Sequence, residues 1–205
     1  MKTKKGDFVE IEFVASTEDG IIFDTNIKEE AKKIDIDDKE REKLEPLKVC
    51  IGQGMILKGL DKELEDKELE KEYDVKLNSE SAFGKRNPGL VKTVPLAAFS
   101  ETPYQGMFIN VNGLMARVVS VNGGRILVDF NNPLAGKNVN YKFKILKMIE
   151  GKDDKIKVIA ESLKVEIENI DLAKEPVEIK LKNKKNSEKF IKRIKELVSL
   201  DCKIV

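Results

Sequence analysis

The chain has 205 residues, of which 40% are hydrophobic and 37% are charged, and its 38 basic and 37 acidic residues give a net charge of +1. Such a balance excludes a strong overall field that would attract nucleic acid or an anionic membrane. The chain has no histidine, which excludes imidazole catalysis and imidazole metal sites, and its two cysteines, Cys50 and Cys202, lie far apart, which argues against a disulfide framework or a cysteine metal cluster.

The apolar runs are too short to span a bilayer, and residues 1–7 lead into a strand pattern without the apolar core of a signal peptide. We therefore expect a globular, cytoplasmic protein that needs neither a metal nor a cofactor.

Alternating polar and apolar residues predict a first strand over residues 8–15 and a second over residues 21–26. Asp19-Gly20 between them is a strong hairpin signal. Residues 27–45 are mostly charged and weakly helical, so they are predicted to form a solvated excursion between two strands.

An unusual apolar triplet follows the next strand, which is predicted over residues 47–51. Met55-Ile56-Leu57 lies between the glycine breaks at Gly52-Gln53-Gly54 and Gly59, immediately before a helix predicted over residues 61–71. Helix N-termini favour polar caps and leave backbone N–H groups without partners. An apolar triplet at this point predicts the wall of an apolar pocket that contains an amide donor.

A further strand is predicted over residues 73–77, followed by a loop that carries the isolated aromatic Phe83. Three short strands joined by Asn-Gly turns then predict a compact β-module over residues 107–130. A module this short cannot bury all of its apolar residues, so we expect some of them to form a surface that binds client chains. The candidates for this surface are Met107, Phe108, Ile109, Leu114 and Met115.

The last strand of the main sheet is predicted over residues 139–149, and the polar residues 151–154 are a candidate linker. Beyond the linker, residues 151–205 predict a small α+β domain. Its elements are helices at 155–163 and 187–200 and strands at 165–170 and 177–181, followed by a short end at 203–205.

Four motifs carry a family resemblance. Gly6-Asp7 with Phe23-Asp24-Thr25, the segment 51–60, Ala82-Phe83-Gly84 and the segment 133–137 resemble the FKBP-type peptidyl-prolyl isomerases in order and spacing. The β-module between the third and fourth motifs is similar to that of the SlyD-like branch, and the C-terminal extension is similar to that of long archaeal members. The resemblance covers residues 1–150.

The resemblance implies an α+β fold in which a strongly curved antiparallel sheet wraps around one short helix. It implies a discontinuous isomerase domain formed by residues 1–85 and 128–150. An inserted-in-flap module at 86–127 would bind unfolded chains, and residues 151–205 would form the C-terminal α+β domain.

The resemblance also implies the site residues. Phe13 and Phe23 would be aromatic walls, Asp24 the family's carboxylate and Phe83 the flap aromatic, and these four would be the catalytic residues. The Ile56 N–H would hold the peptide carbonyl. The peptide-binding residues implied in this way are Leu47, Val49, Met55, Ile56, Leu57, Leu60, Leu90 and Tyr141.

The sequence departs from the family pattern at several positions. Phe13 and Phe83 replace tyrosines, Asp66 and Glu70 replace glycines that end and follow the helix, and Asn78-Ser79 replaces a Pro-Pro pair.

The implied function is acceleration of Xaa-Pro isomerisation during protein folding, with proline-containing peptides and unfolded proteins as partners. Two alternatives stay open: a non-catalytic holdase with a degenerate pocket, and an assembly protein whose C-terminal domain dominates, for example as a homodimer. From the residues alone, the strand aromatics are compatible with an ordinary core and Asp24 with a turn.

Overall fold

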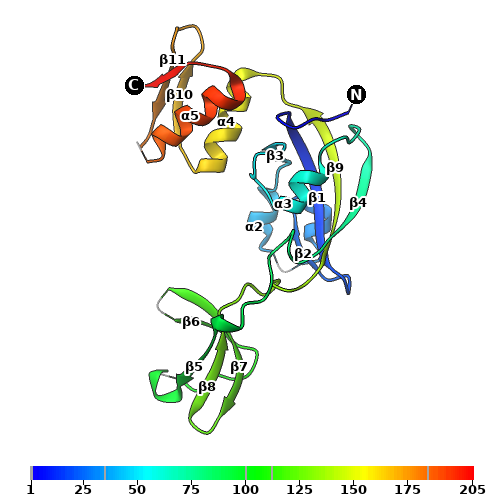
Figure 1. Cartoon of the computed structure of the whole chain (residues 1–205), viewed down its shortest axis with the longest axis vertical. Helices are drawn as coiled ribbons and strands as arrows, with labels where there is room; N and C mark the ends of the chain where they lie inside the picture. Colours follow the sequence, from blue (N-terminus) through cyan, green and yellow to red (C-terminus); the bar gives the residue numbers. More distant parts are fainter. Residues whose placement is uncertain (1, 35, 100, 112, 184) are drawn as a thin grey trace. The chain divides into compact units, whose positions relative to one another are not determined.

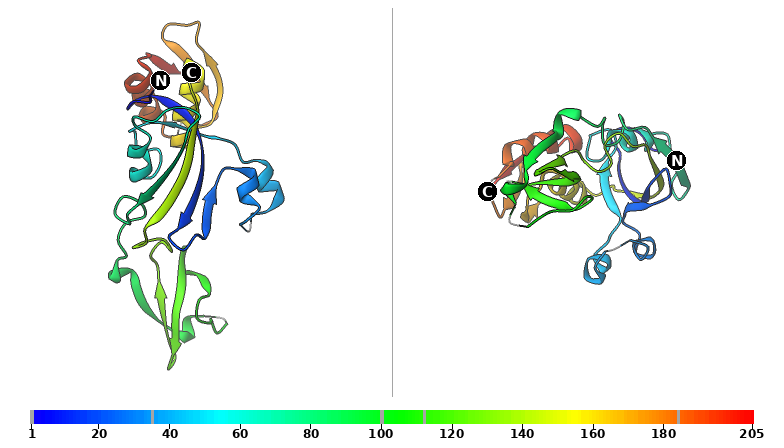
Figure 2. Two further views of the ribbon diagram at one scale, coloured as in Figure 1. Left: turned by 90° about the vertical axis from the view of Figure 1, so that its right-hand side faces the viewer. Right: turned by 90° about the horizontal axis from the view of Figure 1, so that it is seen from below.

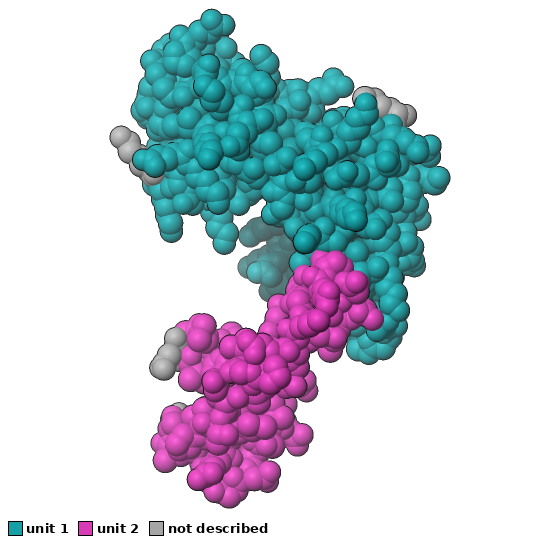
Figure 3. Space-filling view, viewed as in Figure 1, with its two compact units in different colours: residues 1–77, 139–205 teal, residues 78–138 magenta. Residues whose placement is uncertain are grey.

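The computed structural model describes residues 2–34, 36–99, 101–111, 113–183 and 185–205, so Asn112, expected in a hairpin turn, lies outside the described residues. The chain forms two compact units, coloured separately in Figure 3. Unit 1 consists of residues 1–77 and 139–205, and unit 2 of residues 78–138. No helix in the described ranges is both long and apolar enough to cross a bilayer.

A five-stranded antiparallel sheet forms the body of unit 1 (Figure 1). Its strands are β1 (Phe8–Thr17), β2 (Ile22–Thr25), β3 (Leu47–Cys50), β4 (Glu72–Leu77) and β9 (Val139–Met148). β1 is central. It pairs with β9 along one edge and with both β2 and β3 along the other, and β4 lies beyond β9. Figure 2 shows the long strands β1 and β9 side by side.

Strand alternation places the core on one face of β1. Ile11, Phe13 and Ala15 are buried, whereas Glu12 and Val14 between them are only half-buried. Side chains of a strand alternate between the two faces of its sheet, so the pattern read from the sequence predicted the strand correctly.

The charged excursion between β2 and β3 carries two short helices, α1 (Lys28–Ala31) and α2 (Asp38–Glu42). Ala31 is the one residue of these two helices that is buried. Exposed ion pairs such as Lys32–Glu29 lie at the surface here. The prediction of a solvated, weakly helical segment is confirmed.

Helix α3 (Lys58–Glu63) is shorter than the predicted 61–71. Asp66 and Glu70, the residues that replace family glycines, adopt φ angles of +58° and +60°. Residues with a Cβ atom rarely adopt this left-handed conformation, and it cannot continue an α-helix. The Glu70 N–H donates to the carbonyl of Ile145, 2.8 Å away, which ties this turn to β9.

The C-terminal part of unit 1 contains α4 (Lys152–Leu163), β10 (Ile167–Asp171), β11 (Val177–Leu181), α5 (Ser187–Val198) and β12 (Cys202–Ile204). β11 is the middle strand, and β12 runs parallel to it. Residues 152–154 are the first turn of α4 rather than a linker. Asp153 and Asp154 suit this position because carboxylates are stabilised near the positive end of a helix dipole.

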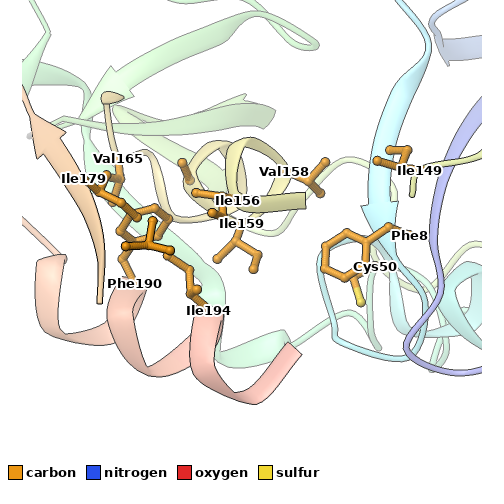
Figure 4. Packing of buried hydrophobic residues seen from close by; sticks show 12 residues of the cluster. Phe8, Cys50, Ile149, Ile156, Val158, Ile159, Val165, Ile179, Phe190 and Ile194 are labelled. Carbon is orange, nitrogen blue, oxygen red and sulfur yellow. The ribbon is translucent and has the colours of Figure 1, made fainter. Parts of the chain in front are cut away.

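One hydrophobic cluster joins these C-terminal elements to the five-stranded sheet. Its fully buried side chains include Ile159 of α4 and Phe190 of α5, and it continues to Phe8, Cys50 and Ile149. Figure 4 shows α4 between the C-terminal sheet and Phe8 with Cys50. Burial raises the pKa of the Cys50 thiol to about 12. The C-terminal elements therefore share a core with the main sheet.

Unit 2 is built on a four-stranded antiparallel sheet with the order β5-β8-β7-β6. Its elements are the 3₁₀ helix η1 (Pro88–Leu90), β5 (Val91–Pro95), η2 (Leu96–Ala98), β6 (Phe108–Val111), β7 (Leu114–Asn122) and β8 (Arg125–Asp129). The sequence predicted three strands, and β5 is the fourth because it pairs with β8 along its whole length.

Unit 2, residues 78–138, contains more residues than the predicted insert 86–127. The reason is that the segments leading into and out of the insert are hydrogen-bonded to each other. The Gly136 N–H donates to the Gly84 carbonyl, 2.8 Å away, and the Ser79 N–H donates to Asn138 Oδ1, 3.2 Å away. These contacts fix the base of the unit at residues 78–84 and 130–138.

Candidate active site

Three aromatic side chains from neighbouring strands meet on one face of the five-stranded sheet. The Tyr141 ring on β9 lies 5.9 Å from the Phe13 ring on β1 and 6.4 Å from the Phe23 ring on β2, measured between centroids. Phe23 meets Tyr141 edge-on, with 80° between the ring planes. Phe13 and Tyr141 are buried, and Phe23 is half-buried. We call these three side chains the aromatic cluster.

Strand register places Asp24 beside this cluster. Ala15 of β1 pairs with Asp24 of β2 on one side and with Tyr141 of β9 on the other. Residues directly opposite each other in an antiparallel sheet project to the same face, on strands about 4.8 Å apart. The register between β1 and β2 shifts between Ala15 and Ser16, so strict alternation is broken here and Phe23 can reach the cluster beside Asp24. The methyl group of Ala15 fills little of the space between the carboxyl group and the aromatic ring.

Ala15, Asp24 and Tyr141 form a row across three strands, in which the Tyr141 side chain is buried and the Asp24 side chain is exposed to solvent but partly desolvated by its neighbours. Desolvation raises the pKa of the Asp24 carboxyl above its ordinary value, and a hydrogen bond from the Thr25 N–H partly opposes this rise. Burial raises the pKa of Tyr141 to about 12, and the nearby Asp24 charge adds to the effect. The Tyr141 hydroxyl is thus neutral, and within the described ranges no hydrogen-bond partner for it is found.

Two residues that sequence inspection did not assign to the site hold β2 in place. The buried Thr25 hydroxyl donates to the Phe13 carbonyl, 2.7 Å away, and Asn26 Oδ1 accepts from the Phe13 N–H at 2.8 Å. Asn26 Nδ2 also donates to the Ile11 carbonyl at 2.8 Å. These side-chain bonds add to the pairing of Thr25 with Val14 at the end of β2, which fixes Phe23 and Asp24 just before it.

Asp61 organises the loop that precedes α3. Only 5% of its surface is exposed, and its two carboxylate oxygens accept from the Gly52 N–H and the Gly54 N–H, each 2.8 Å away. Hydrogen bonds to a charged acceptor are stronger than neutral ones. Sequence inspection missed this role; the available signal was a carboxylate on a short helix that follows two closely spaced glycines.

The three residues of the apolar triplet, Met55, Ile56 and Leu57, have different surroundings. Leu57 is the N-cap residue of α3 and provides no side-chain cap. No acceptor for the backbone N–H of Ile56 occurs among the residues that the structure describes. Within that part of the chain the Ile56 N–H is left available as a donor, and its role in binding a peptide stays a prediction from the family resemblance. The sequence grouped Met55 with the peptide-binding residues. In the structure Met55 is half-buried, its Sδ accepts from the Cys50 N–H at 3.3 Å and its side chain packs against the C-terminal cluster, so its contact with a peptide stays a prediction.

Three further peptide-binding candidates lie within the sheet and helix framework. Val49 and Leu60 are buried, with 1% and 3% of their surface exposed. Leu47 is half-buried and pairs with Ile11 at the start of β3. Buried side chains of this kind can form the floor of a pocket but offer little surface to a ligand.

Phe83 and Leu90 belong to unit 2. Phe83 is half-buried in the connecting segment that is tied by the Gly136–Gly84 hydrogen bond, and Leu90 is exposed at the end of η1. Their roles in catalysis and peptide binding stay predictions from the family resemblance.

Unit 2 exposes a group of large apolar side chains around the β6–β7 hairpin. Phe108 is 54% exposed, Leu114 63% and Met115 60%. Ile109, predicted to belong to the same surface, is instead buried against Ala116, because it alternates with Phe108 along β6 and faces the core of the unit. Met107 is half-buried and packs against that core.

A hollow of about 820 Å³ also lies along the five-stranded sheet. It is lined by residues such as Val14, Ser16 and Lys142, which alternate along β1 and β9 with Phe13, Ala15 and Tyr141. Most of its lining therefore belongs to the opposite face of the sheet, away from the aromatic cluster.

A family model described as FKBP-type peptidyl-prolyl cis-trans isomerase matches residues 1–98, and one described as FKBP26, IF domain matches residues 92–134. A short-type peptidyl-prolyl cis-trans isomerase of Methanocaldococcus jannaschii is 32% identical over 145 residues, which cover 69% of this chain and 91% of the relative.

The FKBP-type peptidyl-prolyl cis-trans isomerase SlyD of Escherichia coli K12 is 24% identical over 162 residues, covering 76% of this chain and 75% of the relative. The protein of the same name from Helicobacter pylori is 27% identical over 118 residues, covering 55% of this chain and 64% of the relative. The chain therefore belongs to the FKBP-type peptidyl-prolyl cis-trans isomerases, among which it is SlyD-like.

Proposed function

We propose that this peptidyl-prolyl cis-trans isomerase of the FKBP type acts on Xaa-Pro bonds of folding protein chains and binds the proline ring at the aromatic cluster. The observation that carries the proposal is the row Asp24, Ala15 and Tyr141, with Phe13 and Phe23 beside it. This row combines apolar walls with a carboxyl group and a neutral hydroxyl around a small residue.

The chemistry needs no nucleophile. Amide resonance creates a barrier of about 18–20 kcal/mol to rotation about the peptide bond. The twisted transition state has lost part of that resonance and of the amide dipole, so an apolar, water-poor site stabilises it relative to the planar ground state. A chain without histidine can supply such a site.

The proposal gives each residue of the site a task. The aromatic cluster holds the pyrrolidine ring through apolar contact. The unpaired Ile56 N–H donates to a carbonyl of the peptide and fixes its direction. Asp24 and the Tyr141 hydroxyl orient the polar groups next to the rotating bond, and Phe83 and Leu90 are assigned to the peptide by resemblance.

Removing an aromatic wall is expected to reduce catalysis. Burial of a phenylalanine side chain is worth about 1.5–3 kcal/mol, so Phe23→Ala should lower kcat/KM by about 10- to 100-fold. The measurement is a proline-limited refolding reaction together with isomerisation of a short Xaa-Pro peptide. Ile21→Ala is the control, because Ile21 is exposed two residues earlier.

Asp24→Ala is expected to reduce kcat/KM without reducing stability. Folding raises the pKa of this carboxyl, so the ionised group does not stabilise the folded state. If the wild-type chain leaves the slow refolding phase unchanged while it still suppresses aggregation, the non-catalytic holdase replaces the enzyme proposal.

We also propose that Phe108, Leu114 and Met115 bind unfolded chains, because apolar side chains so exposed form a surface suited to hydrophobic segments. Replacing all three by serine should abolish suppression of aggregation and lower activity on refolding proteins, with short-peptide activity unchanged. Ile21→Ser, at an exposed apolar residue elsewhere, is the control. Equal chaperone activity in the triple variant and the control would contradict the proposal.

The domain boundaries, the cytoplasmic location and a homodimer through residues 151–205 stay proposals. Exposed Leu172 and Val205 favour a dimer contact at the edges of the C-terminal sheet, since ion pairs such as Glu168–Lys180 and Glu178–Lys203 occupy its strands. Sedimentation of the full chain over a range of concentrations tests the dimer, and cell fractionation tests the location.

A further inference from the structure

Arg193 of the C-terminal helix α5 forms two hydrogen bonds to Gln53, in the loop that precedes the apolar triplet Met55-Ile56-Leu57. Arg193 Nη1 donates to Gln53 Oε1 at 3.0 Å, and Nη2 donates to the Gln53 carbonyl at 2.9 Å. The two residues are 140 positions apart in the chain. Because the planar guanidinium presents its donors in a fixed fork, this pair of bonds restricts both the position and the orientation of Gln53.

The same loop is held from the side of α3 by Asp61. Its carboxylate binds the N–H groups of Gly52 and Gly54, the two neighbours of Gln53. Three consecutive residues of the loop are thus fixed by charged groups of opposite sign. Gly52 and Gly54 have φ angles of +75° and +67°, so the backbone here has a conformation that side chains other than glycine disfavour.

The packing around this contact makes the C-terminal elements part of the loop's support. Met55, two residues after Gln53, packs against the cluster that contains Phe190 and Cys50. The Lys155 ammonium lies 5.6 Å from the centre of the Phe8 ring. Arg193 also approaches Glu196, at 3.8 Å, but that residue is on the same helix and adds no link to the loop.

We infer that Arg193 is a positioning residue of the isomerase: through Gln53 it holds the segment 52–57 so that the Ile56 N–H points at the bound peptide. This inference rests on the proposed function of Ile56. A donor that must meet one carbonyl needs a rigid support, and a displacement of about 1 Å in such a support can reduce activity by up to about 100-fold. The C-terminal domain then contributes to catalysis from outside the pocket.

The test compares Arg193→Ala with Lys192→Ala in the full chain. Lys192 is the adjacent helix residue, with 77% of its side chain exposed against 25% for Arg193. Hydrogen exchange is measured at the Gly52 and Gly54 amides, and kcat and KM are measured with a short Xaa-Pro peptide. Loss of hydrogen bonds from a charged donor should accelerate exchange at both amides by about tenfold or more in Arg193→Ala and leave Lys192→Ala unchanged.

Isomerase activity on the short peptide is expected to change in Arg193→Ala and to stay unchanged in Lys192→Ala. A misplaced Ile56 donor weakens peptide binding, so Arg193→Ala should raise KM by about tenfold with kcat within about a factor of two. A second variant, Gln53→Ala, removes one of the two bonds without touching the C-terminal core, and we expect it to give a smaller change in the same direction.

Two results would overturn the inference. One is an unchanged rate of hydrogen exchange at the Gly52 and Gly54 amides in Arg193→Ala and in Gln53→Ala. The other is faster exchange that extends equally through α4 and α5, since Arg193 would then only stabilise the C-terminal elements. If the wild-type chain lacks isomerase activity, the proposed function fails, whereas the exchange measurement still decides whether Arg193 holds the loop.

Discussion

Asp61→Ala is expected to lower the free energy of unfolding by about 3 kcal/mol, because hydrogen bonds to a charged group contribute about 1.5–3 kcal/mol each and two partly buried backbone hydrogen bonds lose their acceptor. The donors of these bonds are the N–H groups of Gly52 and Gly54. The same change frees the loop before Ile56, so we expect kcat/KM for a short Xaa-Pro peptide to fall by about 100-fold.

Urea unfolding and the peptide assay measure these two effects on the same sample. Lys62→Ala is the control, since Lys62 is the exposed neighbour of Asp61 on α3. A loss of stability below about 1 kcal/mol for Asp61→Ala would mean that water replaces the carboxylate at both glycine amides.

Phe190→Ala is expected to destabilise the C-terminal elements more than any surface change in α5. Phe190 is fully buried in the cluster of unit 1, and truncation of a buried phenylalanine to alanine typically costs about 3–5 kcal/mol. Since the cluster continues to Cys50, loosening it should expose the Cys50 thiol to solvent.

Alkylation of Cys50 at pH 8 reports this opening. In the wild-type chain, burial and a pKa of about 12 leave the thiol almost entirely protonated and shielded, so modification should be slow. We expect Phe190→Ala to accelerate it at least tenfold, whereas Lys189→Ala, at an exposed neighbouring position, should not. Equal rates for the two variants would show that Cys50 is protected by the main sheet alone.

Much of the fold followed from short-range patterns. Alternation along residues 8–15 and 139–149 predicted β1 and β9, and amphipathic spacing predicted α5. These signals are local, because the buried face of a strand or helix is recorded in its own sequence. The aromatic residues Phe13, Phe23 and Tyr141 were likewise assigned to one site, by resemblance, and the structure brings their rings together.

The remaining features depend on contacts between distant segments. Local periodicity does not predict the hydrogen bond from Arg193 to Gln53. Nor does it predict the hydrophobic cluster that Phe8 shares with the C-terminal elements. Ile109 shows a different limit: its hairpin is apolar on both faces, and the sequence alone did not show which face is covered. The length of α3 was misjudged because Asp66 adopts a conformation that its side chain disfavours.

The pairing of β4 with β9 leaves only a short gap at the point where unit 2 is inserted in the chain. Leu77, the last residue of β4, and Val139, the first residue of β9, are paired directly across the sheet, although unit 2 lies between them in the chain. Paired residues of this kind lie about 5 Å apart, a gap that a tight turn of two residues can close. Unit 2 therefore occupies the position of the loop in a β-hairpin formed by β4 and β9. An insert of another size can replace it at this point without shifting the pairing of the two strands.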